Sequence, residues 1–138
     1  MSKTPDTKSE LAEPMAVRWK TTPDDHDYPA AANYLSLICP HEEALDLADK
    51  LKKAPIVTFK AKDILRASRL DLLDLDNPHV RLDLRKVAMG IELSPVLLIR
   101  GDIKRAIPAQ IADGYHRVCA SYNLDENTDI PARVIDLP

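Results

Sequence analysis

The spacing of apolar and polar residues predicts alternating helices and strands over most of this chain. Apolar residues recur at helical spacing in residues 40–54 and 79–91. Residues 55–61, 94–101 and 130–137 are short apolar or β-branched runs, which are typical of strands. These five segments provide the framework of the predicted fold.

Two of the predicted helices have a well-defined apolar side. In residues 40–54 we expect this side to comprise Leu45, Leu47, Ala48 and Leu51. In residues 79–91 we expect it to comprise Val80, Leu84, Val87 and Ile91. Acids lead the first of these helices and lysines close it, which is the charge order that a helix dipole favours.

Shorter elements complete the order. A proline in the first turn suits a helix over residues 29–38, and residues 62–68 predict one or two further helical turns. Residues 109–114 predict a strand that returns from a polar hairpin loop. A helix then begins at Tyr115, because apolar side chains follow it at i+3, i+4 and i+7. This order predicts an α+β fold with a small mixed sheet flanked by helices.

The 138 residues are enough for one domain, and their composition divides them into three parts. Residues 1–28 are polar and predict a flexible tail, because they cannot bury enough apolar surface to order themselves. We expect Trp19 to anchor this tail on the domain's own surface rather than on a partner. Residues 29–54 are expected to form a helical extension packed on the domain, and residues 55–138 the domain itself.

Charge and cysteine content narrow the class of protein. The net charge of −3 disfavours nucleic acid as a partner, because nucleic-acid surfaces of proteins are strongly basic. The two cysteines have no metal-ligand spacing, which argues against a disulfide framework or a zinc site. No signal-peptide pattern opens the chain and no run approaches the ~18 apolar residues of a membrane span. We therefore expect a cytoplasmic protein with no membrane partner.

The segment IADGYHRVCASYNL, residues 111–124, contains the candidate chemistry. The first N–H groups of a helix lack partners within the helix, and the helix dipole is positive there. Gly114 lets a ligand approach the backbone, Arg117 offers a planar fork for phosphate oxygens, and His116 offers a further donor. An ordinary junction fits these residues too, with Asp113 as the helix cap and the His-Arg pair in solvent.

Residues 58–135 resemble the ParB/sulfiredoxin superfamily, which includes ParB-type nuclease domains, sulfiredoxins and ParB-like free serine kinases. VTFKAKDIL resembles its opening strand and short helix, and RKVAMGIELSPVLLIRG its helix before a P-x-x-V/L strand. IADGYHRVCASYNLDENTDIPARVI resembles its D-G-x-H-R-x-x-A helix start and I-P-x-x-V/I closing strand. The resemblance implies this fold, with nucleotide phosphates held at Gly114, His116 and Arg117.

The chain also departs from the superfamily pattern. Tyr115 stands where sulfiredoxins have their reactive cysteine, which argues against sulfinic-acid repair. Cys119 does not replace that cysteine, because it lies on the apolar side of the helix, and we expect a buried structural thiol. ParB partition proteins usually read Gly-Glu-Arg-Arg here and carry a helix-turn-helix domain. This chain has neither, which disfavours a centromere-binding role.

The sequence therefore predicts a domain that binds a nucleotide or another phosphorylated small molecule. The candidate binding residues are Asp113, Gly114, Tyr115, His116, Arg117, Lys60 and Lys86. Lys60 follows the opening strand, where superfamily positions approach the nucleotide, and Lys86 lies off the apolar side of its helix. The expected cofactor is a nucleoside triphosphate or diphosphate with Mg²⁺, which Asp113 would face.

The sequence leaves the reaction, the metal and the function class open. Phosphoryl transfer and nucleotide hydrolysis are both compatible with the site, because no general base can be named. Residues 24–27 contain three acids and a histidine, but their place in a turn predicts no dedicated metal site. The rival functions are a nuclease or DNA-associated protein, and a non-enzymatic module that forms homo-oligomers or binds a partner.

Overall fold

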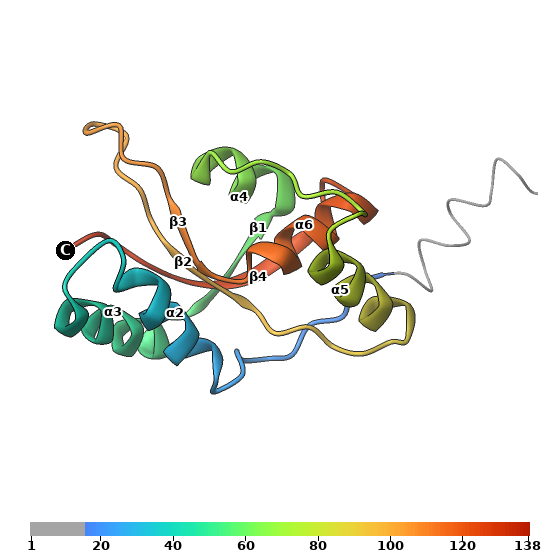
Figure 1. Cartoon of the computed structure of the whole chain (residues 1–138), viewed down its shortest axis with the longest axis horizontal. Coiled ribbons are helices and arrows are strands. Elements are labelled where there is room, and N and C mark those ends of the chain that lie inside the picture. The colour runs from blue at the N-terminus through green and yellow to red at the C-terminus, as the bar shows by residue number, and fades with distance from the viewer. Residues whose placement is uncertain (1–15) are drawn as a thin grey trace, which may run out of the picture.

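The computed structural model describes residues 16–138, which form five helices around a four-stranded sheet (Figure 1). The helices are α2 (Asp27–Leu35), α3 (His41–Lys53), α4 (Ala61–Ser68), α5 (Pro78–Ala88) and α6 (Tyr115–Leu124). The strands are β1 (Ile56–Lys60), β2 (Val96–Ile99), β3 (Gln110–Asp113) and β4 (Asp129–Ile135). The predicted α+β arrangement is confirmed. No helix in the described range is long and apolar enough to span a bilayer.

The sheet is mixed, with the strand order β1–β4–β2–β3. β4 pairs antiparallel with β1 and parallel with β2, and β3 pairs antiparallel with β2. Parallel neighbours need a crossover connection, which the β3 hairpin and α6 supply between β2 and β4. This topology brings the end of β3 and the start of α6 beside the first residue of β2.

Helices cover both faces of the sheet, so that the chain forms three layers (Figure 1). The buried residues of β2 alternate in direction, as the pleat of a strand requires. Val96 and Leu98 pack with α4, α5 and α6, whereas Leu97 and Ile99 pack with α2 and α3. Each face therefore has its own apolar core.

Residues 16–28 differ from the expected tail, because they pack on the domain. Trp19 forms an isolated parallel bridge with Leu93 and packs against the core beneath α4, α5 and α6. Its predicted docking on the chain's own surface is therefore confirmed. α2 begins at Asp27, two residues before the predicted start, and the Asp27 side chain is buried. Composition does not predict that residues 16–28 are ordered. Their order depends on backbone hydrogen bonds and on the burial of one acid, Asp27. Residues 1–15, also predicted as tail, lie outside the described residues.

The apolar sides of two helices differ in detail from the prediction. Leu45 of α3 is 50% exposed, and Ala44 is buried instead. α5 ends at Ala88 rather than at residue 91, because Gly90 adopts a positive φ of 74° that terminates the helix. Ile91 consequently lies outside the helix and is 44% exposed.

Candidate functional site

The predicted glycine turn exists, and its geometry admits only glycine. Gly114 has a φ of 111°, in the left-handed region, and forms the N-cap of α6. A Cβ at this position would lie 2.5 Å from Cγ1 of the buried Val96. Among the described residues, no side chain caps α6, so its first backbone N–H groups have no side-chain acceptor. Asp113, the expected cap, points elsewhere.

Arg117 lies inside a network of carboxylates rather than in solvent. Its Nη2 donates to Asp113 Oδ2 at 3.1 Å, to the Pro95 carbonyl at 3.3 Å and to Asp27 Oδ2 at 3.5 Å. Only 17% of the Arg117 side chain is exposed, and only 4% of that of Asp27. The guanidinium therefore joins the start of α2, the entry to β2, the end of β3 and the first turn of α6.

This network changes the electrostatics that the sequence predicts. A guanidinium shared by two carboxylates has no excess positive charge to offer a phosphate. Burial raises the pKa of the Asp113 carboxyl, the Arg117 charge opposes that rise, and the neighbouring Asp27 adds to it. The Nε atom of Arg117 is buried and has no hydrogen-bond partner among the described residues. Arg117 thus pairs with acids of this chain, and these acids favour a cation nearby.

Three side chains from residues 24–27 converge next to this network. Asp24, His26 and Asp27 each place one ligand atom within 4.8 Å of the others. The Ser94 hydroxyl donates to Asp27 Oδ2 at 2.5 Å and accepts from the Asp24 backbone N–H at 3.0 Å. Hydrogen bonding from Lys20 lowers the pKa of the Asp24 carboxyl, which is therefore charged at neutral pH. The sequence alone does not predict a metal site here, because nothing in it indicates that the turn at residues 24–27 has one fixed conformation.

Two histidines and a buried acid lie on the other side of Arg117, where α5 packs on α6. The ring centroids of His79 and His116 are 4.7 Å apart. Burial and the neighbouring His79 lower the pKa of His116, so its imidazole is neutral at pH 7. Asp83 is 8% exposed. The charges of Arg117, Lys86 and both histidines act to lower the pKa of its carboxyl. Burial nevertheless outweighs these charges and raises the pKa of the Asp83 carboxyl.

Replacing Asp83 with asparagine is expected to stabilise the protein at pH 7.5 by more than the ~0.5 kcal/mol typical of surface substitutions. A raised carboxyl pKa means that the fold holds the proton more tightly than the unfolded chain. Ionisation of Asp83 therefore lowers the free energy of unfolding by its full amount above the pKa of the folded state. This loss disappears as pH falls towards the ordinary value of 3.8. Urea unfolding at pH 7.5 and pH 4 measures the difference between the variant and the wild type.

The control for Asp83→Asn is Asp46→Asn, which changes an exposed acid on α3. We expect Asp46→Asn to change the free energy of unfolding by less than about 0.5 kcal/mol at either pH. A loss of stability in Asp83→Asn at pH 7.5 would contradict the prediction. It would mean that the charged carboxylate makes contacts worth more than its desolvation.

The remaining candidate residues occupy different places. The Tyr115 hydroxyl donates to the Asp71 carbonyl at 2.6 Å, which leaves it tied to the loop before α5. Lys86 is exposed on α5, on the Asp83 side of the site. Cys119 is fully buried, as the sequence predicts.

Lys60, which the sequence predicts as a binding residue, lies away from the start of α6. Its ammonium pairs with Asp129 at 2.9 Å and donates to the Asn127 carbonyl at 3.3 Å. Both acceptors follow the C-terminal end of α6, whereas Gly114 precedes its N-terminal end. Ten residues of helix separate the two ends by about 15 Å. Lys60 therefore lies too far from Gly114 to hold the same phosphate group.

Sequence reasoning missed Ser94 and Asp83 as members of this site, and it considered Asp27 only within the acidic turn at residues 24–27. Asp83 did leave a signal, since it falls between Val80 and Val87 at helical spacing, on the apolar side of α5. An acid at such a position is unusual and points to a special environment. Ser94 left no comparable signal, and the contacts of Asp27 with Ser94 and Arg117 form only in the folded chain.

Comparisons of this chain with protein-family models, with curated proteins and with solved structures found no match.

Proposed function

We propose that this chain binds a nucleoside diphosphate or triphosphate together with Mg²⁺ at the start of α6. The observation that carries the proposal is the uncapped first turn of α6, which begins at a left-handed glycine beside a cluster of carboxylates. The phosphate and the cation would occupy neighbouring parts of the same site.

The phosphate part comprises backbone N–H groups and His116. An uncapped helix start offers several N–H donors and the positive end of the helix dipole to an anion. His116 lies in the same first turn and is half-buried. Its neutral imidazole can donate one hydrogen bond to a phosphate oxygen, and a bound phosphate would favour its protonated form.

The cation part comprises the carboxylates near Arg117. A phosphate alone would meet Asp27 and Asp113, whose charges exceed that of the single guanidinium between them. Mg²⁺ prefers oxygen ligands and is commonly shared between one or two carboxylates and the phosphates of a nucleotide. Asp24 and Asp27 supply such oxygens, and Asp113 faces the same region. We therefore infer that the nucleotide enters as its Mg²⁺ complex.

Two further considerations favour this function over the rivals. The resemblance of residues 58–135 to the ParB/sulfiredoxin superfamily implies nucleotide phosphates at the same turn. A nuclease or DNA-associated protein would need a continuous basic surface past Arg117, whereas acids surround this residue. Phosphoryl transfer or nucleotide hydrolysis would follow only if one of these groups activates a nucleophile.

A panel of ATP, ADP, CTP and GTP, each with and without Mg²⁺, tests the proposal by thermal shift and calorimetry. At least one nucleotide is expected to raise the melting temperature when Mg²⁺ is present, because a ligand of the folded state stabilises it. Excess EDTA is expected to abolish the shift. If millimolar nucleotide with Mg²⁺ leaves the melting temperature unchanged in every case, the proposal fails.

Adjacent acids provide a matched pair of variants for the cation. Asp24→Asn removes a carboxylate of the cluster, whereas Asp25→Asn removes an exposed carboxylate outside it. We expect Asp24→Asn to raise the apparent Kd of the Mg²⁺-nucleotide about tenfold, and Asp25→Asn to leave it nearly unchanged. Both variants alter the net charge equally. Equal effects would therefore indicate only a general electrostatic contribution, and would remove Asp24 from the site.

A further inference from the structure

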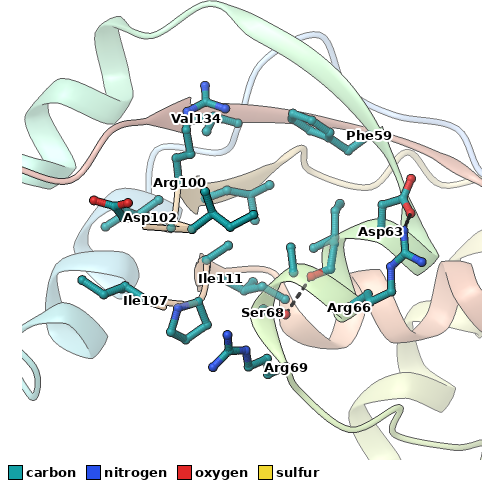
Figure 2. A pocket seen from close by; sticks show the side chains of 18 of the residues that line it. Phe59, Asp63, Arg66, Ser68, Arg69, Arg100, Asp102, Ile107, Ile111 and Val134 are labelled. Carbon is teal, nitrogen blue, oxygen red and sulfur yellow. Dashed lines mark hydrogen bonds and ion pairs between the residues drawn. The ribbon is translucent and has the colours of Figure 1, made fainter. Parts of the chain in front are cut away.

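A groove of about 720 Å³ lies between α4 and the β2–β3 hairpin, away from the start of α6 (Figure 2). Each of the four strands contributes at least one apolar residue to its lining. These residues are Phe59, Leu98, Ile111 and Val134, and β2 contributes Ile99 as a second. The volume lies in the range of ~300–1,000 Å³ that small-molecule sites occupy. An apolar sheet surface of this kind is usually covered by a helix, and α4 covers only part of it.

Charged residues surround this apolar floor, and one of them has no partner. Arg66 pairs with Asp63 at 3.1 Å, and Arg100 pairs with Asp136 at 2.7 Å. Arg69 has no ion-pair partner in the part of the chain that the structure describes. Figure 2 shows Arg69 and Arg100 on opposite sides of Ile111.

The lining acids are already neutralised by arginines. Asp63 accepts from Arg66, and Asp102 accepts from Arg105 at 2.8 Å. Arg69 is therefore the charge that a ligand would meet. Its guanidinium is a planar fork that matches a carboxylate.

Backbone strain gives a second, independent indication. Arg69 and Ala106 have φ values of 57° and 56°, and both line the groove. No other non-glycine residue within 16–138 has a positive φ. Arg69 ends α4, a position where glycine or asparagine would adopt this conformation more readily. Residues in sparsely populated backbone conformations concentrate at functional sites, where the surrounding structure holds them in place.

We propose that this groove binds a small amphipathic carboxylate, with its apolar body on the sheet floor and its carboxylate at Arg69. The apolar floor supplies the driving force, because binding removes the floor and the apolar body from water. The unpaired guanidinium sets the charge of the ligand and disfavours cations. This proposal is independent of nucleotide binding, since the groove shares no residue with the site around Arg117.

Decanoate and 1-decanol, which share an apolar chain and differ in the head group, are the probes. Calorimetry and amide NMR on the full chain are expected to show saturable decanoate binding, with shifts concentrated at Leu98, Ile111 and Ala67. Decanol is expected to bind at least about fivefold more weakly, because it lacks the charge-assisted bond. Absence of saturable decanoate binding, or shifts concentrated around α6, would overturn the proposal.

Variants separate the role of Arg69 from the total charge. Arg69→Asn suits the left-handed backbone and is expected to raise the Kd of decanoate about fivefold without affecting decanol. Arg81→Asn, on the exposed side of α5, makes the same charge change and is expected to leave both affinities unchanged. Ile107→Glu places a carboxylate in the groove and is expected to weaken decanoate more than decanol. Equal effects of Arg69→Asn and Arg81→Asn would contradict the assignment of Arg69.

Discussion

Replacement of Arg117 with alanine is expected to lower the free energy of unfolding by about 3–5 kcal/mol. The substitution leaves Asp27, which is 4% exposed at its side chain, and Asp113 without their shared cation. Two neighbouring carboxylates without a cation, in a site with little access to solvent, destabilise the fold strongly. Urea unfolding at pH 7.5, followed by circular dichroism, measures this loss.

Two further variants identify the cause of the loss. Arg85→Ala, on the exposed side of α5, is expected to change stability by less than about 0.5 kcal/mol. Arg117→Ala combined with Asp113→Asn is expected to recover part of the loss, because one of the stranded charges is removed. A loss below about 1 kcal/mol in Arg117→Ala would instead show a solvated arginine, free for a phosphate as the sequence predicts.

Replacement of Gly114 with alanine is expected to destabilise the protein by about 3 kcal/mol or more. Two penalties add up here, since the left-handed φ of 111° is strained for any L side chain and the new Cβ meets Val96 at 2.5 Å. Val96 is fully buried in the core beneath α4, α5 and α6 and cannot move aside. Chemical unfolding at a single pH is a sufficient measurement.

Gly90 offers a matched control for the steric part of this prediction. Gly90 has a φ of 74°, and a Cβ there would meet nothing within 4 Å. Gly90→Ala is therefore expected to show the conformational penalty alone, about 1–2 kcal/mol. Equal losses in the two variants would mean that Val96 adapts at no measurable cost.

The sequence predicted most of the fold because each element carries its own periodic signal. Every helix and strand in residues 27–138 occurs where apolar spacing or turn residues predict it, with ends displaced by a few residues. The displaced end of α5 is explained by Gly90, whose role as a terminator depends on a backbone angle rather than on periodicity. Residues 16–28 were missed for a different reason. Their order depends on Trp19 and Asp27, which find partners about seventy residues further along the chain.

The candidate site was predictable only in part. Gly114 and His116 lie where the motif D-G-x-H-R places them, at the first turn of α6. The partners of Arg117 were not predictable, since nothing in the spacing of residues indicates that Asp27 would reach it. Charge neutralisation within a site is a property of the folded chain, and Arg117, which the sequence predicts as a phosphate ligand, pairs with two carboxylates in the structure.

The pairing of Asp27 with Arg117 also has a consequence for the order of folding. The two residues are 90 positions apart, so this contact closes one of the longest loops in the chain. Contacts of such large separation are expected to form late, after local helices and the β2–β3 hairpin. During synthesis, Asp27 leaves the ribosome well before its cation does, at ~5–20 residues per second. In the nascent N-terminal half, the Asp27 carboxylate therefore stays exposed to water. The site forms only after nearly the whole chain has been synthesised.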